Sequence, residues 1–461
     1  MTRPEIEARA VAARARLCAH GQEHVLRFFD ELDGPAQVKL LEQVEGLDLK
    51  WLGRVLGAGE AAIRPEEIRP CDEIIRPGHA REAEALTMGR QALARGQVAV
   101  LLVAGGSGSR LGFHGPKGAF PLGPLSGKTL FQLHAEQLLA QGRRGGATPL
   151  LFLMTSAAND AETRRIWRDN GLFGLKEEGL FIFTQGEAPA VDEGGKLLLA
   201  DRDRLVSAPN GNGGLFAALA HSGALERMRQ GGIQCLSYVQ VDNALSPSCD
   251  ERFIGFHQLL GSDFSCKGIS KRDPAEKVGS YAQVDGRLRI VEYYELPAAL
   301  ASAQGQDGAL LYGLSNPGMF LWSRAFLERQ AARQDLPYHR AHKKIPHLDA
   351  RGGLVSPEEP NGYKLESFAM DTLPEAQRTV LLACDRQQEF APVKNRQGQD
   401  SPETARELLM GLHRKWLLAA GATLKDPWAK VEISALYAAD EAALKQRLPR
   451  GFVVQGDLYL K

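Results

Sequence analysis

The stretch that decides the fold is Val98-Ala-Val-Leu-Leu-Val-Ala-Gly-Gly-Ser-Gly-Ser-Arg-Leu-Gly112. Its first six residues are apolar and predict a short buried strand, and a glycine-rich loop follows directly. Glycines in such a loop let backbone N–H groups approach a phosphate closely, and the nearby Arg110 can add a bidentate charge contact. The stretch therefore predicts a phosphate-binding turn at the end of a strand, with a plain tight turn as the alternative.

The same alternation of strand and helix continues outward from this loop. Apolar runs predict further strands near 150–154, 181–183 and 235–241, and helical spacing predicts helices near 130–139, 160–169 and 215–228. Strands alternating with helices at this spacing indicate βαβ units and a doubly wound, mostly parallel α/β sheet. Such sheets bind ligands at the carboxyl ends of their strands.

The rest of the chain has a different character. Residues 1–95 have helical periodicity and no recognisable chemistry, so we expect a helical N-terminal domain there. Residues 279–295 predict an antiparallel insertion, with Asp285-Gly286 as its hairpin turn. Ser401-Pro402 predicts the start of a last helix. We therefore expect a catalytic domain over 96–388 and a small C-terminal domain over 389–461.

Composition excludes several classes of function. Lys+Arg and Asp+Glu both number 56, so no excess of positive charge indicates a nucleic-acid partner. The six cysteines are scattered without a Cys-x-x-Cys pair, which argues against a disulfide framework or a zinc site. No signal peptide is recognisable, and the longest apolar run is far below the roughly 20 residues of a membrane span. We expect a cytoplasmic protein with no membrane partner, and nothing in the sequence indicates its oligomeric state.

Two familiar phosphate motifs fail on spacing. A dinucleotide fingerprint needs a third glycine where this chain has Leu111, and a P-loop ending at Gly127-Lys128-Thr129 would need its first glycine at Leu122. Instead the loop is followed by Pro116-Lys117-Gly118, which places a second cation on a restricted backbone. The alternative is a solvated surface lysine.

Together these motifs resemble the eukaryotic-type UDP-N-acetylhexosamine pyrophosphorylases, within the wider UDP-sugar pyrophosphorylase family. The resemblance runs from about Gly96 to Gly421, with its segments in family order. They are 104–112, Pro116-Lys117-Gly118, Gln185-Gly186, Asn210-Gly-Asn-Gly-Gly214, Val241-Asp242-Asn243, Val278-Gly279, Val291-Glu292-Tyr293, Lys343-Lys-Ile-Pro346, Pro360-Asn-Gly362 and Pro392-Val-Lys-Asn395.

The resemblance implies the fold of a nucleotide-diphospho-sugar transferase and a set of phosphate-binding groups. The amides of Gly105, Gly106, Gly108 and Ser109 would hold the UTP phosphates. The catalytic cations would be Arg110, Lys117 and Lys394. The reaction is an attack by a sugar phosphate, already an anion, on the α-phosphorus of UTP, so it needs alignment and charge neutralisation and no general base.

Further roles follow for the metal, the base and the sugar. Asp242 ends a buried-looking strand, where a carboxylate suits Mg²⁺, with a turn aspartate as the alternative. By resemblance, Gln185 and Asn212-Gly213 would read uracil, and Gly279, Glu292 and Asn316 would contact the sugar. The chain departs from the family at Gly313-Leu-Ser315, where only the following Asn316 survives of Asn-Ala-Gly-Asn, which puts the identity of the sugar in doubt.

The leading hypothesis is a uridylyltransferase that condenses UTP with N-acetylglucosamine 1-phosphate, or a related N-acetylhexosamine 1-phosphate. UTP–glucose-1-phosphate uridylyl transfer is the runner-up. UDP-glucose enzymes usually carry an asparagine in the glycine loop, where this chain has Ala104-Gly-Gly106. A catalytically silent UDP-sugar-binding regulator is the third hypothesis, and the presence of all four of Arg110, Lys117, Asp242 and Lys394 argues against it.

Overall fold

A computed structural model describes residues 1–57, 63–333 and 336–461. The chain forms two compact units that each draw on separate segments. Unit 1 holds Met1–Ala62, Gly186–Leu215 and Gln334–Asp371, and unit 2 holds Ile63–Gln185, Phe216–Arg333 and Thr372–Lys461. These units are not the consecutive domains expected from the sequence, whose boundaries stay a prediction.

Unit 1 begins with the helices that periodicity predicts. They are α1 (Arg3–Cys18), α2 (Gly34–Gly46) and α3 (Leu49–Gly57). Their apolar faces pack on a three-stranded antiparallel sheet in the order β16 (His339–Lys343), β19 (Gly362–Glu366) and β6 (Val191–Asp192). The helical segment is therefore completed by strands that lie far away in the sequence.

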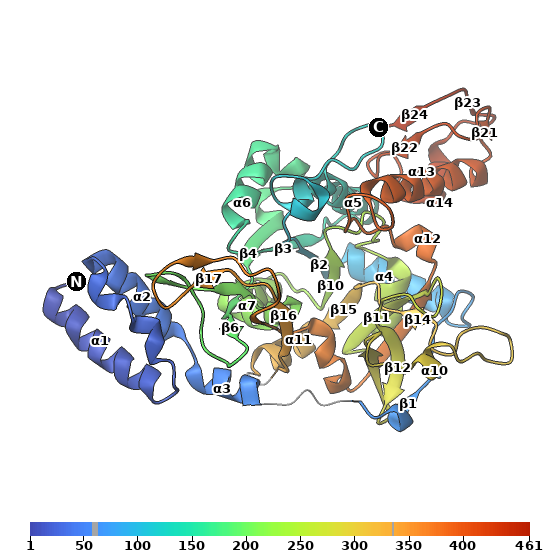
Figure 1. Cartoon of the computed structure of the whole chain (residues 1–461). Coiled ribbons are helices and arrows are strands. Elements are labelled where there is room, and N and C mark those ends of the chain that lie inside the picture. The colour runs from blue at the N-terminus through green and yellow to red at the C-terminus, as the bar shows by residue number, and fades with distance from the viewer. Residues whose placement is uncertain (58–62, 334–335) are drawn as a thin grey trace. The chain divides into compact units, whose positions relative to one another are not determined.

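Unit 2 is built on a large mixed sheet (Figure 1). Its parallel part runs in the order β4 (Leu180–Thr184), β3 (Leu150–Thr155), β2 (Val98–Val103) and β10 (Cys235–Gln240). The sheet continues through β15 (Phe320–Ser323), which is antiparallel to both of its neighbours, to β11 (Phe264–Ser270), which pairs in parallel with β20 (Thr379–Cys384). The predicted mostly parallel α/β fold is confirmed.

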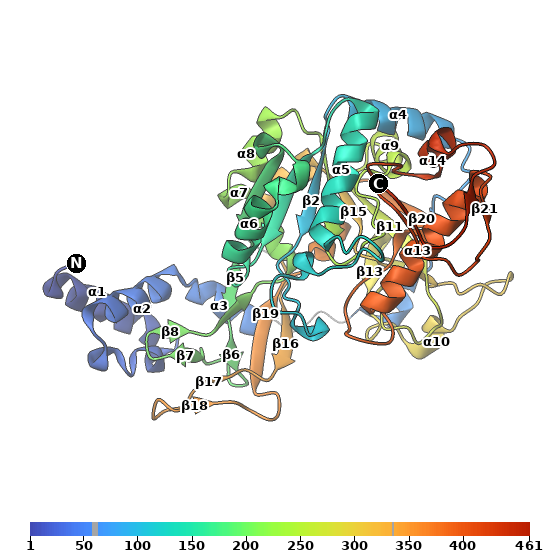
Figure 2. The same cartoon turned by 90° about the horizontal axis from the view of Figure 1, so that it is seen from above.

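Helices cover both faces of this sheet. On one face, α4 (Glu82–Ala94) packs closely on α9 (Glu251–Leu259), and α5 (Leu130–Gly145) covers β2 and β3 (Figure 2). On the other face, α7 (Leu215–His221) and α11 (Arg324–Ala331) pack Phe216 and Phe326 against aromatic residues of the strands. Apolar side chains on both faces explain why β2 is a continuous apolar run rather than an alternating one.

The expected insertion is an antiparallel hairpin of β12 (Ser280–Val284) and β13 (Arg287–Val291). The turn is Asp285-Gly286, as predicted, and both residues have positive φ, at 51° and 69°. The hairpin joins the main sheet, because β12 also pairs with β1 (Ile68–Arg69) and β14 (Leu314–Ser315). It therefore extends the sheet edge.

Two helix predictions are wrong. The helix expected over 215–228 is two helices, α7 and α8 (Ala224–Gln230), because Gly223 between them adopts φ +82°. The helix α13 (Pro402–Ala419) begins with Ser401 as its cap, as expected, but α14 (Glu441–Arg447) follows it. Among the described helices, none combines the length and apolar character that a membrane span needs.

The C-terminal residues of unit 2 are anchored to the segment before α5. Strand β22 (Val431–Ile433) carries Glu432, which is buried. Its carboxylate accepts hydrogen bonds from the backbone N–H groups of Leu125 and Ser126 at 2.7 Å each, and from the Ser126 hydroxyl. The last residues of the chain therefore fix the connection that leads into α5.

Candidate active site

The glycine loop after β2 is held by side chains that follow the neighbouring strand, β3. The Ser156 hydroxyl donates to the Gly105 carbonyl at 2.8 Å, and the Asn159 amide donates to the Ala104 carbonyl at 2.8 Å. Within the described part of the chain, the backbone N–H groups of Gly105 and Gly106 donate no hydrogen bond. The loop carbonyls are thus fixed while these N–H groups stay available to an anion.

The next part of the loop closes on itself. The Gly108 N–H donates to the Gly115 carbonyl at 2.9 Å, so Gly108 shapes the loop through a committed amide. Ser109 and Arg110 lie in a short 3₁₀ helix, Ser109–Leu111, and are exposed. Among the described residues, Arg110 has no ion-pair partner. Among the described residues, the predicted phosphate contacts without a hydrogen-bond or ion-pair partner are therefore the N–H groups of Gly105, Gly106 and Ser109 and the Arg110 guanidinium.

Lys117 and Asp242 meet beside this loop. Lys117 Nζ donates to Asp242 Oδ2 at 2.9 Å, although the two residues lie far apart in the sequence. The Lys117 N–H also donates to the Gly106 carbonyl at 3.0 Å, which fixes the lysine against the phosphate loop. Asp242 is the second residue after β10 and is only 8% exposed. The predicted catalytic lysine and metal-binding carboxylate therefore belong to one site.

Lys394 reaches the same strand end through the backbone. The Val393 N–H donates to the Asp242 carbonyl at 2.9 Å, so Lys394 follows the residue that pairs with Asp242. The Asn243 side chain binds this segment through two hydrogen bonds. It donates to the Glu389 carbonyl and accepts from the Ala391 N–H, at 2.8 Å each. Lys394 itself is exposed.

A buried histidine supports the end of β10. His134 of α5 lies 3.1 Å from the Val241 carbonyl through its Nε2 atom. Burial lowers the pKa of His134 to about 4, against the opposing influence of the Val241 carbonyl and the Asp242 charge. The ring is therefore neutral at physiological pH, and its Nε2–H donates to the backbone just before Asp242.

The predicted uracil contacts fall into both units. Gln185 follows β4 in unit 2, and its side-chain oxygen would lie 3.4 Å from a Cβ placed on Gly105. Asn212 and Gly213 belong to unit 1, where the Asn212 Oδ1 atom accepts from the Ala369 N–H at 2.8 Å and the Gly213 N–H donates to Ser367. Gln185 thus joins the phosphate loop, whereas Asn212 and Gly213 shape a turn of unit 1, and the base contacts stay predictions.

The three predicted sugar contacts come together at the ends of antiparallel strands. Gly279 precedes β12, Glu292 follows β13 and Asn316 follows β14. The Asn316 N–H donates to the Gly279 carbonyl at 2.9 Å, and a Glu292 carboxylate oxygen would lie 3.0 Å from a Cβ on Gly279. Any side chain at position 279 would meet this carboxylate, so glycine lets Glu292 approach the backbone.

A buried lysine in the interior of the sheet forms ion pairs with two carboxylates. Lys267 of β11 is 1% exposed, and its ammonium pairs with Asp250 and Glu389. Burial alone would lower the pKa of Lys267, but these two carboxylates outweigh burial and raise the pKa. Glu389 also supplies the carbonyl that Asn243 binds. The charge cluster therefore connects the interior of the sheet to the Lys394 segment.

Sequence reasoning missed the residues that hold these groups in place. Ser156 and Asn159 follow β3, and the rule that carboxyl ends of parallel strands meet at one edge would have selected them. The roles of His134 and Asn243 depend on contacts between distant segments, for which the sequence gives no local signal.

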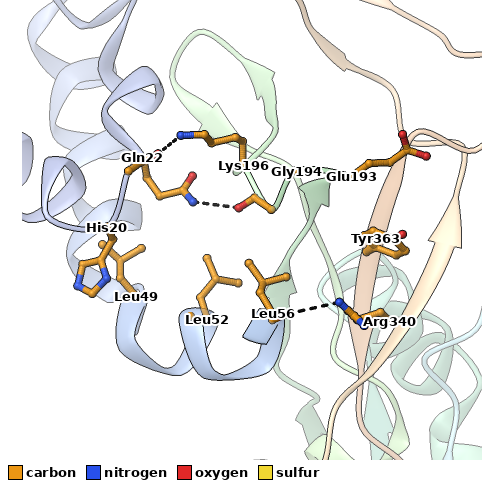
Figure 3. A pocket seen from close by; sticks show the side chains of 13 residues that line it. His20, Gln22, Leu49, Leu52, Leu56, Glu193, Gly194, Lys196, Arg340 and Tyr363 are labelled. Atoms are coloured by element: carbon orange, nitrogen blue, oxygen red, sulfur yellow. Dashed lines mark hydrogen bonds between the residues drawn. The ribbon is translucent and has the colours of Figure 1, made fainter. Parts of the chain in front are cut away.

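Unit 1 has a hollow of about 350 Å³ that contains none of the predicted site residues (Figure 3). Leu49, Leu52 and Leu56 of α3 form an apolar wall, and Arg340 and Tyr363 lie beyond Leu56, where the Arg340 guanidinium donates to the Leu56 carbonyl at 3.4 Å. The Gln22 amide donates to the Gly195 carbonyl at 2.9 Å at its rim.

Comparison with known proteins agrees with this geometry. The family described as UTP–glucose-1-phosphate uridylyltransferase matches residues 58–436. The chain belongs to this family. Among curated relatives, UDP-N-acetylhexosamine pyrophosphorylase-like protein 1 from Homo sapiens is 37% identical, covering 90% of this chain and 86% of the relative. UDP-N-acetylglucosamine diphosphorylase 2 from Arabidopsis thaliana is 35% identical, covering 89% and 85%.

A solved structure supports the same family at the level of the whole fold. The crystal structure of the uridine diphosphate N-acetylglucosamine pyrophosphorylase from Trypanosoma brucei superimposes with a TM-score of 0.82 at 28% identity. The match covers 97% of this chain and 98% of that one. The family resemblance seen in the motifs is therefore confirmed over nearly the full length of the chain.

Proposed function

We propose that this protein is a nucleotidyltransferase that condenses UTP with N-acetylglucosamine 1-phosphate, giving UDP-N-acetylglucosamine and pyrophosphate. The observation that carries the proposal is the ion pair of Lys117 and Asp242 beside a glycine loop with open N–H groups. The names of the human, Arabidopsis and Trypanosoma relatives support the amino sugar.

The reaction requires the protein to align two polyanions. An oxygen of the sugar phosphate attacks the α-phosphorus of UTP, the bond to the β-phosphate bridging oxygen breaks, and pyrophosphate leaves with that electron pair. The N–H groups of Gly105 and Gly106 and the Arg110 guanidinium bind phosphate oxygens. Lys117 and Lys394 stabilise negative charge that grows on the α-phosphate as the reaction proceeds.

Asp242 is the residue that we propose holds Mg²⁺. Its Oδ1 atom accepts no hydrogen bond from the described residues, while Oδ2 is bonded to Lys117. No group of three or more potential ligands occurs in the described ranges, and Mg²⁺ commonly takes one or two carboxylates, waters and substrate phosphates, so a single carboxylate fits it. When bound, the ion would neutralise charge between the phosphates. Lys117 can turn from Asp242 toward the substrate.

Glucose 1-phosphate is the second candidate substrate, because the matching family carries that sugar in its description. Gly279, Glu292 and Asn316 form a polar cluster whose groups suit either sugar. A carboxylate accepts from sugar hydroxyls, and an amide supplies a donor, so both sugars satisfy the same pair of groups.

The test is pyrophosphate release from UTP with a panel of sugar 1-phosphates. We expect the highest kcat/KM with N-acetylglucosamine 1-phosphate, then N-acetylgalactosamine 1-phosphate, then glucose 1-phosphate. Preference for glucose 1-phosphate would overturn the sugar assignment alone. Tight binding of UDP-sugar without pyrophosphate release from any member of the panel would identify a silent binding protein.

A further inference from the structure

The Tyr281 hydroxyl lies between two acceptors beneath the sugar edge. Tyr281 is in β12 and is 1% exposed. Its oxygen lies 2.9 Å from the Lys267 carbonyl and 3.2 Å from Asn316 Oδ1. A phenol has one proton, so it donates to one of these oxygens at a time. The hydroxyl therefore connects the interior strand β11 with a residue predicted to contact the sugar.

The orientation of the Asn316 amide is fixed by a second bond. The Gly318 backbone N–H donates to Asn316 Oδ1 at 2.8 Å. A backbone N–H only donates, so the atom facing Gly318 and Tyr281 must be the amide oxygen rather than the nitrogen. The Asn316 NH₂ group lies on the opposite side of the amide. The amide is thereby held with its oxygen toward Gly318 and Tyr281.

The backbone of Glu292 is also held beside the sugar edge. The Glu292 N–H donates to a carboxylate oxygen of Glu295 at 2.9 Å, which fixes the backbone of Glu292 next to Gly279. Glu292 offers carboxylate oxygens, which accept from hydroxyl groups, and Asn316 offers N–H groups, which donate to hydroxyl or carbonyl oxygens.

We propose that Tyr281 is a positioning residue for the sugar 1-phosphate and that it acts through Asn316. The inference rests on the proposed function. Tyr281 fixes the Asn316 side chain in the rotamer that presents its NH₂ group, so removing the hydroxyl lowers the population of that rotamer. Because the UTP phosphates bind at the parallel strand ends, the effect falls on the sugar substrate. The loss of one buried hydrogen bond corresponds to about a three- to tenfold change in binding.

The experiment compares two conservative variants by steady-state kinetics of pyrophosphate release. Tyr281→Phe should raise the KM for the sugar 1-phosphate about three- to tenfold and leave the KM for UTP unchanged. Tyr312→Phe is the matched control, because Tyr312 is also buried, at 4% exposure, and its hydroxyl bonds the Ile68 carbonyl at 3.2 Å without reaching Asn316. It should change neither constant.

Two further variants test the route through Asn316. Asn316→Asp keeps an acceptor for Gly318 and Tyr281 but lacks the NH₂ donor, so its KM for the sugar should rise at least as much as that of Tyr281→Phe. In an Asn316→Ala background, Tyr281→Phe should add no further change. If Tyr281→Phe does not fold, Asn316→Asp decides, and a wild-type KM for the sugar there overturns the proposal.

The outcomes separate this inference from the proposed function. A wild-type enzyme that releases no pyrophosphate with any sugar 1-phosphate contradicts the function itself. An active wild type with an unchanged sugar KM in folded Tyr281→Phe contradicts the positioning role alone. Equal increases in both KM values, or additive effects with Asn316→Ala, would show that Tyr281 has a general structural role.

Discussion

Unit 2 has two groups of predicted site residues, one at the ends of its parallel strands and one at the ends of its antiparallel strands. The two groups differ in how many of their polar atoms already have hydrogen-bond partners. At the parallel edge, Gly106 and Arg110 are exposed and their donors are open among the residues that the structure describes, where the Lys117 ammonium pairs with Asp242 alone. At the antiparallel edge, Gly279 is buried, and Asn316 is fixed by bonds from its own backbone and from Gly318.

Under the proposed function, this difference separates the residues that meet the changing phosphate charge from the residues that recognise the sugar. Phosphates change their charge distribution during the reaction, so their partners gain from being available and able to move. A sugar keeps its hydroxyl pattern throughout, so its partners gain from being fixed before it arrives. Variants at the parallel edge should therefore lower turnover, whereas variants at the antiparallel edge should weaken sugar binding.

Asp242→Asn is expected to have the largest effect. The amide keeps the shape but loses the charge that a hard cation needs, so kcat should fall by about 10³-fold or more at ordinary Mg²⁺. Steady-state kinetics at several Mg²⁺ concentrations provide the measurement, with the unfolding temperature as a check on folding. Near-normal turnover of a folded variant would remove Asp242 from the metal site.

Lys117→Ala should lower kcat by about 10²- to 10³-fold while UTP binding falls far less, because the charge it stabilises grows in the transition state. The variant also removes the ammonium from Asp242, so the Mg²⁺ concentration for half-maximal activity should not rise. A UTP titration alongside the kinetics makes the comparison. Equal losses of binding and turnover would reduce Lys117 to a binding residue.

Glu292→Ala tests the antiparallel edge. Removing the carboxylate should raise the KM for the sugar 1-phosphate about ten- to a hundredfold and change the KM for UTP much less, because only the sugar hydroxyls lose an acceptor. Varying each substrate at saturating concentrations of the other measures both constants. A larger effect on UTP would place Glu292 outside the sugar pocket.

Lowering the pH should reduce the free energy of unfolding through His134, which supports the end of β10. This effect should be smaller than the effects of the three substitutions. Burial lowers the pKa of His134 to about 4. Below pH 6.5 the unfolded chain therefore binds a proton at this residue that the folded chain does not bind. His134 should therefore cost up to about 1.4 kcal/mol of stability per pH unit as the pH falls from 6.5 towards 4, and nothing above 6.5.

Urea unfolding at pH 7, 6 and 5 tests this slope. His134→Gln removes one titrating group and should make the decline shallower without abolishing it, because burial also lowers the pKa of His257 and His413, whereas His20→Gln at an exposed position should leave it as in the wild type. Identical slopes in the wild type and His134→Gln would contradict the role of His134.

The sequence predicted the parallel edge well because its signals are local. An apolar run followed by glycines specifies both β2 and its loop, and Asp285-Gly286 specifies its own hairpin turn. The sugar contacts were predicted only through the family resemblance, since Gly279, Glu292 and Asn316 lie next to the ends of three different strands.

Other features had no local signal. The break at Gly223 depends on a left-handed backbone conformation that glycine permits but does not require. Tyr281 was missed because its role comes from two acceptors on other strands, and apolar packing explains a tyrosine at that position equally well.

The position of β20 at the side of β11 sets an order of events during protein synthesis. Strand β11 is translated first, but its partner ends at Cys384, beyond the hairpin, β15 and the third segment of unit 1. While residues 271–378 emerge from the ribosome, that edge of β11 has no strand to pair with. An open edge is a template for pairing with other chains, so the nascent polypeptide depends on rapid completion or chaperone protection over this interval.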